Sequence, residues 1–250
     1  MARVVILGTA YSVAAEEHQN THFAVIGRER QVLVDCTGTP NVRLKRAGME
    51  INNLTDLILT HFHPDHVSGA PLLLMQMWLL GRSRPLNIYG LAPVMDRMET
   101  LMGFYDWATW PNFFPVTFNR LPSEEMTPVL SCDEMVIHAS PVQHMIPTIG
   151  LRFDFDDGRS LAYSCDTAPC GEVVRLAKDA DVLIHEASGG PIGHSTAREA
   201  GEIAARAGAH ALYLIHYPTI NPDYTAMLLE ASQAFNGPVK LAQDYMTFGF

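Results

Sequence analysis

The chain has 250 residues, 48% of them hydrophobic and 18% charged, and a formal net charge of −10. This length and composition predict one globular domain over residues 1–250, and no apolar run approaches the roughly 20 residues of a membrane span. With 17 basic residues against 27 acidic ones there is no overall basic face, which disfavours a large nucleic acid as substrate.

The amino-terminal residues do not resemble a signal peptide, because the sequence runs directly into a strand-like pattern at 3–8. The four cysteines form no CxxC pair. Reduced, buried thiols are therefore expected rather than disulfides, and the protein is expected to be cytoplasmic.

Strand and helix patterns alternate along the rest of the chain. Further strands are predicted near 22–27, 31–35, 56–60, 86–89, 135–140, 148–155, 159–164, 182–185 and 211–215. Helices are predicted near 67–80, 92–103, 170–178, 196–207 and 222–234. Strand-rich halves interleaved with helices indicate an α/β protein with two sheets and helices outside them.

Two of the predicted helices have a start that can be identified closely. Thr196 and Glu199 form the S/T-x-x-E pattern of a capping box. Asn221 followed by Pro222 indicates an N-cap with proline at the first helical position. These two helices are therefore expected to begin at 197 and 222.

Three histidines and one aspartate fall within six residues, where a predicted strand ends and a predicted helix begins. Neutral imidazole and carboxylate are ligands that zinc and similar divalent ions prefer. In an extended segment His61 and His63 point the same way, because side chains alternate with a period of two. Beyond them the chain turns at a proline, so Asp65 and His66 can face a second point. One segment can therefore serve two adjacent metal ions.

Aromatic residues gather at Phe104–Phe118, which holds seven of the chain's 22. Pro111 and Pro115 oppose a regular helix there. Three interpretations are open: the segment walls an apolar substrate pocket, holds two subunits of a homodimer together, or packs on the core. Trp107 and Trp110 are the side chains expected nearest a substrate, since large flat rings bury apolar groups well.

The HxHxDH spacing after an apolar strand resembles the metallo-β-lactamase superfamily. That family's pattern needs three further ligands, and His144, Asp166 and His216 match them in order, each at the end of an apolar run. The resemblance implies an αββα metallo-β-lactamase sandwich, with two β-sheets flanked by helices. It also implies two divalent metal ions, with zinc expected and iron or manganese as alternatives. The implied ligands are His61, His63, His144 and Asp166 for one ion, and Asp65, His66, Asp166 and His216 for the other.

Two further segments resemble the ribonuclease Z group within this superfamily. Residues 184–188 and 193–196 resemble its HEAT and HST motifs, and residues 7–10 resemble its LGTG start. Carried over, Glu186 orients His194, and His194 donates a proton or a hydrogen bond at the leaving group. A histidine held by a carboxylate is a competent acid near neutral pH.

One departure from the ribonuclease Z group concerns its long tRNA-clamping arm, which lies between the third-ligand His and the bridging Asp of the bacterial enzymes. Here His144 and Asp166 are 22 positions apart, and two paired strands with the turn Asp156-Asp157-Gly158 fill that interval. The sequence therefore leaves no room for an arm.

The preferred functional interpretation is a dinuclear metal-dependent hydrolase acting on ester bonds of a small-molecule substrate. The resemblance implies attack by a hydroxide that bridges the two ions, with Asp65 both binding metal and orienting the nucleophile. Phosphodiesters or aryl sulfates are favoured, and lactones or other esters are alternatives. A tRNA 3′-end endonuclease is the second hypothesis, and a non-catalytic metal-binding sensor is the third.

Overall fold

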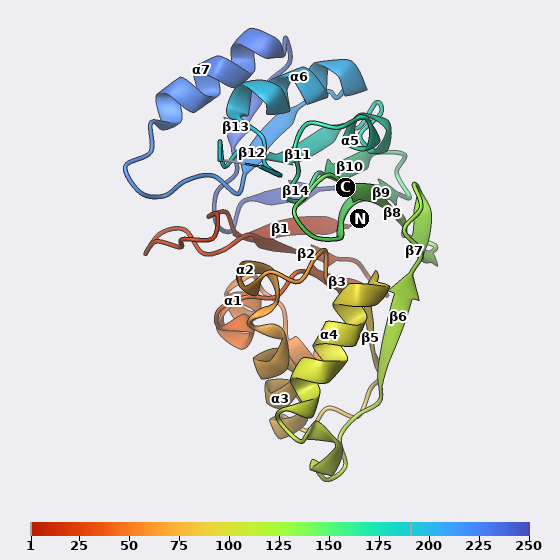
Figure 1. Cartoon of the computed structure of the whole chain (residues 1–250). Coiled ribbons are helices and arrows are strands. Elements are labelled where there is room, and N and C mark those ends of the chain that lie inside the picture. The colour runs from red at the N-terminus through yellow and green to blue at the C-terminus, as the bar shows by residue number, and fades with distance from the viewer. Residues whose placement is uncertain (1, 191) are drawn as a thin grey trace.

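The computed structural model describes residues 2–190 and 192–250, and it shows two seven-stranded sheets stacked between two layers of helices (Figure 1). The first sheet has the order β14 (Thr247–Gly249), β1 (Arg3–Gly8), β2 (His22–Ile26), β3 (Gln31–Val34), β4 (Asp56–Ile58), β5 (Leu86–Leu91) and β6 (Val116–Leu121). The second has the order β13 (Val239–Leu241), β12 (Leu212–Ile215), β11 (Val182–Glu186), β10 (Ser160–Tyr163), β9 (Thr148–Phe155), β8 (Met135–Val142) and β7 (Thr127–Cys132). The predicted αββα sandwich is confirmed.

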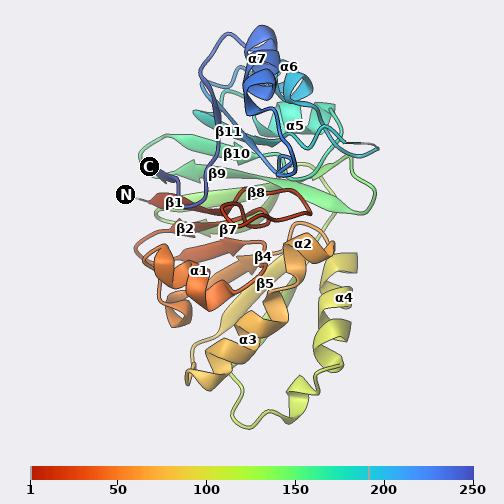
Figure 2. The ribbon, with the colours of Figure 1, turned by 90° about the vertical axis from the view of Figure 1, so that its left-hand side faces the viewer.

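The helices cover the outer face of each sheet (Figure 2). The first sheet is covered by α1 (Pro40–Arg46), α2 (Pro64–Val67), α3 (Ala70–Leu79) and α4 (Ala92–Gly103), with short 3₁₀ turns η1 (Ile51–Asn53) and η2 (Trp107–Thr109). The second is covered by α5 (Gly171–Leu176), α6 (Ala197–Ala207) and α7 (Tyr224–Ala234). Within the described residues, no helix is both long and apolar enough to cross a bilayer.

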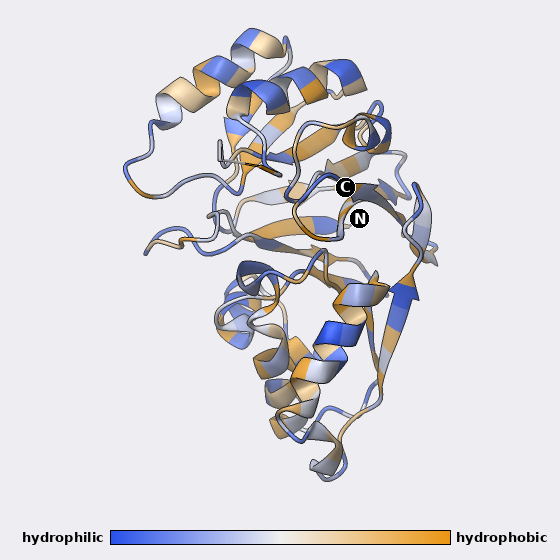
Figure 3. Cartoon of the chain, viewed as in Figure 1, coloured by the Kyte–Doolittle hydropathy of each residue, from blue (hydrophilic) through white to orange (hydrophobic). Residues whose placement is uncertain are grey.

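Parallel pairing occupies one half of each sheet. Strands β3 to β6 pair in parallel, and so do β10 to β13. Central parallel strands such as β11 and β12 are buried on both faces and read as nearly continuous apolar runs, whereas the edge strand β6 is partly exposed and largely hydrophilic (Figure 3). The carboxyl ends of parallel strands meet at one edge of a sheet, and the loops that leave this edge commonly carry functional residues.

Apolar side chains fill the space between the two sheets. Phe23 of the first sheet meets Phe153 and Tyr163 of the second edge to face, with ring centroids 5.9 and 5.1 Å apart. A second cluster, rich in alanine, lies under α5 to α7. There, a Cβ on Gly201 of α6 would fall 2.5 Å from the carbonyl oxygen of Ala231 in α7, so only glycine permits this helix contact.

Several element boundaries differ from the sequence expectation. The helix predicted at 67–80 is α3 and begins three residues later, at Ala70, because the amide of Gly69 donates to the carbonyl oxygen of Cys36 at 2.9 Å and not within a helix. The capping box at Thr196 is confirmed. The predicted N-cap Asn221 is wrong: α7 begins at Tyr224 because the Asp223 carboxylate accepts from the Ala226 amide at 2.9 Å.

Candidate metal centre

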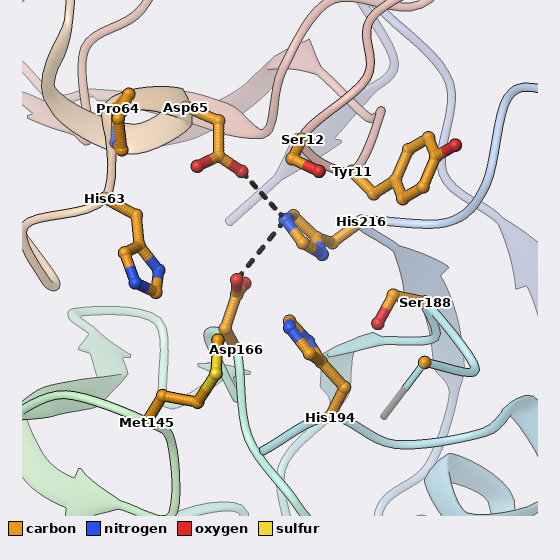
Figure 4. Close-up of a pocket in the computed structure, with 11 residues that line it drawn as sticks. Tyr11, Ser12, His63, Pro64, Asp65, Met145, Asp166, Ser188, His194 and His216 are labelled. Atoms are coloured by element: carbon orange, nitrogen blue, oxygen red, sulfur yellow. Dashed lines mark ion pairs between the residues drawn. The ribbon is translucent and has the colours of Figure 1, made fainter. Parts of the chain in front are cut away.

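The predicted ligand residues arrive from both sheets at one edge of the sandwich. His61, His63, Asp65 and His66 follow β4 of the first sheet. His144, Asp166 and His216 follow β8, β10 and β12 of the second. The structure brings all seven together, and Figure 4 shows Asp65 and Asp166 directed at His216 from two sides.

Three histidines form the first group of candidate ligands. The Nε2 atoms of His61 and His144 lie 3.1 and 3.2 Å from Nδ1 of His63. Burial lowers the pKa of all three imidazoles, and neutral imidazole is the form that binds metal. Nδ1 of His144 lies 2.8 Å from the carbonyl oxygen of Gly193 and donates to it, which leaves Nε2 free for a metal.

Asp65, His66 and His216 form the second group. Oδ2 of Asp65 lies 3.7 Å from Nε2 of His66 and 3.5 Å from Nε2 of His216. Oδ2 of Asp166 lies 3.5 Å from Nε2 of His66, 3.3 Å from Nε2 of His216 and 3.8 Å from Nε2 of His61 in the first group. Asp166 therefore stands between the two groups, as a carboxylate that bridges two cations would.

Unpaired buried atoms test whether metal ions fit these groups. Nε2 of His66, Nε2 of His216 and Oδ1 of Asp166 are buried and have no hydrogen-bond partner among the described residues. Buried polar atoms are almost always paired, so their convergence requires another partner. Borderline divalent ions such as zinc accept this nitrogen and oxygen set, so the residues fit a metal centre.

His66 and Asp166 each influence the charge of the other. Burial opposes charge on His66, but the carboxylates of Asp166 and Asp35 outweigh it and raise the pKa of His66 well above its ordinary value. Burial likewise opposes charge on Asp166, but the imidazoles of His216 and His66 hold its pKa well below its ordinary value. A divalent cation between them would compete with the His66 proton.

Asp35 is a functional candidate that the sequence reasoning missed. Its Oδ2 lies 2.8 Å from Nδ1 of His66, and it also accepts from the amide and hydroxyl of Thr60. The side chain is fully buried at the end of β3. A carboxylate that ends an apolar strand run was the available signal, but only its histidine partner reveals its role.

Backbone conformation also marks the site. Asp35, Cys165 and His216 have positive φ angles of 58°, 55° and 51°. Such angles are uncommon for residues other than glycine, and they cluster at functional sites where surrounding structure maintains them. Each of the three lies in a segment that supplies or supports a candidate ligand.

Glu186 and His194 lie beside the second group. Oε1 of Glu186, which is fully buried, lies 2.9 Å from Nδ1 of His194 and also accepts from the Ser195 amide. The hydrogen bond to Glu186 raises the pKa of His194 above its ordinary value. The His194 ring lies parallel to that of His216 at a centroid distance of 5.8 Å. The structure thus brings this predicted pair together at the centre.

A cavity of about 430 Å³ opens onto these side chains. Tyr11, Ser12 and Ser188 line it on the side of His216, and Met145 lies across from them (Figure 4). Its described lining contains no lysine or arginine and no residue of Phe104–Phe118. The expectation that Trp107 faces substrate has no support here, since Trp107 packs against Phe113 and Phe118.

The chain was compared with known proteins. A family model described as "Beta-lactamase superfamily domain" matches residues 30–217. Ribonuclease Z of Methanothermobacter thermautotrophicus is 26% identical over an alignment of 305 residues, which covers 99% of this chain and 96% of the relative. Because that alignment is longer than this chain, the relative carries segments that this chain lacks.

Two solved structures show the same fold. The metallo-β-lactamase fold protein YhfI from Bacillus subtilis has a TM-score of 0.84 and 22% identity, covering 99% of this chain and 98% of its own. The short form of human tRNase Z has a TM-score of 0.80 and 24% identity, with the same coverage of 99% and 98%. All three similar proteins match the chain along nearly its whole length.

Proposed function

The chain belongs to the metallo-β-lactamase superfamily, in its ribonuclease Z-like branch, and on that premise we propose that it hydrolyses phosphodiester bonds at a two-metal centre. The superfamily membership supports a metal-dependent hydrolase in general. The observation that carries the finer proposal is the pair of ligand groups with Asp166 between them.

The proposed centre takes two divalent ions, zinc first. His61, His63 and His144 would hold one, Asp65, His66 and His216 would hold the other, and Asp166 faces both. When bound, such ions lower the pKa of water and stabilise the negative charge that develops on the substrate. The proposal therefore needs about two ions per chain in metal analysis.

Asp65 is proposed to orient the attacking water. Burial raises the pKa of this carboxyl, but the neighbouring imidazoles of His216 and His66 outweigh burial and lower it. Asp65 is therefore ionised at neutral pH and accepts a hydrogen bond from water in the cavity that it lines. This fixes the direction of attack without a large movement of the chain.

His194 is proposed to act at the leaving group. Glu186 accepts from Nδ1, so Nε2 of the His194 ring is free toward the cavity. The raised pKa keeps the ring protonated to higher pH, so Nε2 donates to the departing oxygen. Glu186 is itself held by the amides of Ser195 and Ser188 and positions the ring.

Two substrate classes are proposed within this chemistry. Similarity to ribonucleases Z over nearly the whole chain favours tRNA 3′-end cleavage, the alternative hypothesis, over hydrolysis of a small ester, the preferred interpretation of the sequence. Two observations favour a small phosphodiester: the net charge of −10, and the tight turn at Asp156–Gly158 that directly joins β9 to β10. Aryl sulfates and lactones are the remaining candidates.

One assay series tests the proposal. The purified protein is stripped with a chelator, reloaded with zinc or manganese, and given bis(p-nitrophenyl) phosphate, p-nitrophenyl sulfate, a lactone and a precursor tRNA with a 3′ trailer. Turnover of a phosphodiester that is lost with the chelator and restored by metal supports the proposal. Faster cleavage of precursor tRNA at its 3′ end assigns the endonuclease. A fully loaded protein that cleaves no phosphodiester contradicts the proposal.

A further inference from the structure

A second, apolar hollow lies between α3 and the segment that follows α4. Its volume is about 200 Å³, and its lining consists of Ser68, Pro71, Leu72, Met75, Tyr105 and Trp110. None of these side chains carries a charge. Leu72, Met75 and Tyr105 are 38%, 41% and 53% exposed, so apolar surface that would normally be covered is open here. We call this hollow the ring cleft.

The aromatic wall of the ring cleft is held in place by contacts behind it. The Trp110 ring stacks on Trp78, with centroids 4.9 Å apart and planes inclined by 20°, and meets Phe113 edge to face. Nε1 of Trp78 donates to the carbonyl oxygen of Pro111 at 2.9 Å, which ties the segment to α3. The flat Trp110 side chain is thus fixed before anything binds, which reduces the entropy lost on binding.

A depression connects the ring cleft to the metal centre. Ser12, Asn20, Pro64, Asp65 and Ser68 line it, and three of them, Ser12, Pro64 and Asp65, also line the metal cavity. Ser68 is shared with the ring cleft. Ser68 is small and exposed, so its side chain does not block the passage between the depression and the ring cleft. One continuous path therefore leads from the metal ligands along α2 onto α3.

The length of this path follows from helix geometry. In Figure 2, α3 leads away from α2, which carries Asp65 and His66. Asp65 and Leu72 are seven positions apart along α2 and α3, which corresponds to about 10 Å along a helix. A group in the ring cleft would therefore lie on the order of 10 Å from the carboxylate of Asp65. A flexible chain of several bonds spans this distance.

We propose that the ring cleft binds a planar, uncharged ring of the substrate, an aryl group or a nucleobase, while the substrate's phosphodiester lies at the metal centre. The inference rests on the proposed function. The absence of charge in the described lining gives a phosphate no partner, whereas a flat ring gains apolar and stacking contact with Trp110 and Tyr105. The small, concave shape suits one ring system, while a subunit contact needs about 800 Å² from each partner.

Kinetics with a shared leaving group test the proposal. The substrates are p-nitrophenyl phosphodiesters of methanol, of phenylalkanols from two to eight carbons, and of the 5′-hydroxyl of thymidine. KM should fall as the tether becomes long enough to reach the cleft, while kcat changes little. The phenyl and thymidine arms distinguish an aryl group from a nucleobase. KM values that do not depend on the tether or the ring overturn the proposal.

Substitutions in the cleft give the second test. Tyr105→Ala and Leu72→Asp should raise KM for the best ring substrate by about 3- to 10-fold and leave the methyl ester unchanged. Phe104→Ala is the matched control, because Phe104 is a neighbouring aromatic, 79% exposed, that does not line the cleft. Equal effects on ring and methyl substrates contradict the proposal. Leu72→Asp avoids the packed Trp110, so a folding defect is not expected to obscure the result.

A ring-only probe separates failure of this inference from failure of the proposed function. Titration of the ¹⁵N-labelled protein with 4-phenylbutanol should shift the Trp110 side-chain resonance in the wild type and not in Leu72→Asp. That result supports the ring-cleft proposal even if the protein cleaves no phosphodiester. A Trp110 resonance that does not shift overturns the ring-cleft proposal even if the protein does cleave a phosphodiester. Sedimentation tests the alternative that a second copy of the chain occupies the cleft. A wild-type dimer that becomes a monomer in Leu72→Asp would overturn the ring proposal in favour of that interface.

Discussion

Asp35 supports the candidate centre from behind, through Nδ1 of His66. Asp35→Asn is expected to weaken zinc affinity by roughly 10- to 100-fold, because a carboxylate behind a metal-binding imidazole orients the ring and raises its basicity. Competition with a chromophoric chelator measures the change. Asp157→Asn, at an exposed turn, is the control and should leave the affinity unchanged. An unaltered affinity in Asp35→Asn would show that the negative charge behind His66 does not contribute to metal binding.

His194 separates a chemical role from a structural one. His194→Ala is expected to retain both metal ions but to lose roughly 10²- to 10⁴-fold in rate, as removal of a general acid does. The loss should be smaller for a substrate with a good leaving group. Metal analysis and rates for two leaving groups measure this. His194 also lies within 4.8 Å of ligand atoms of His144 and Asp166. An empty centre in the variant would therefore make it a ligand.

The pH dependence of turnover follows from the Glu186–His194 pair. The hydrogen bond to Glu186 is the largest cause of the raised pKa of His194. The acid is active when protonated, so activity is present below this pKa and is lost as the pH rises through it. Glu186→Gln should lower the pKa and move the alkaline limb of kcat/KM to lower pH. An alkaline limb that does not move would assign it to another group.

The candidate ligands could be predicted from the sequence because most of these residues lie close together in one motif. Four of the seven fall within six residues, and the other three each end an apolar strand run. The sequence could not identify Asp35, since a carboxylate at a strand end acquires meaning only from the imidazole opposite it. It also could not separate Trp107 from Trp110, which differ in what packs around them and not in local pattern.

At the scale of elements, Glu134 connects the two sheets. It lies in the turn between β7 and β8, and its carboxylate accepts from the amides of Arg28, Glu29 and Arg30 in the turn between β2 and β3. Burial raises the pKa of Glu134, but these three hydrogen bonds outweigh burial and lower it. The turn of one sheet is thus fastened to the turn of the other by a single side chain.

Glu134→Gln should lower the free energy of unfolding at neutral pH by about 1–3 kcal/mol, because a neutral side-chain amide has one acceptor oxygen where the carboxylate presents two to these backbone amides. With a lowered folded-state pKa, the wild type holds this stability above the ordinary glutamate pKa of about 4.3 and loses it as the pH falls through the folded value. Urea unfolding at pH 7 and pH 3 measures the difference. Glu29→Gln in the same turn, with an exposed side chain, is the control. A difference between wild type and variant that is equally large at both pH values would contradict the argument.

Elements were predictable where a periodic pattern is long enough to recognise. The helix at Ala92–Gly103 and the hairpin of β9 and β10 agree with the expectation. Helix α1 and strands β6, β7, β13 and β14 were not predicted. Strands β13 and β14 have only three residues each, too few for an alternating signal. The start of α7 was misplaced by two residues because two cap residues, Asn221 and Asp223, compete within one turn.

For the whole molecule, the sequence predicted the architecture because parallel strands and their helices leave an alternating record along the chain. The sequence contains no comparable pattern that identifies the substrate. The proposed small phosphodiester rests on the charge and the short interval between His144 and Asp166, and the proposed tRNA alternative rests on similarity to ribonucleases Z along the chain. Net charge, chain length between two residues and similarity to relatives describe the protein as a whole. Substrate specificity depends instead on the few side chains that line the cavity and the ring cleft.

Because the candidate ligands come from both sheets, bound metal ions would also hold the two halves of the sandwich together. A ligand that binds only the folded state adds about 4 kcal/mol of stability at a thousand times its Kd. Calorimetry should therefore show a melting temperature that rises with free zinc and falls with chelator, and a control with Asp166→Ala should lose most of that dependence. A melting temperature indifferent to zinc would contradict this coupling. The side chains proposed to bind the catalytic metal ions would then also stabilise the folded state. Metal depletion would therefore lower the protein's resistance to unfolding together with its activity.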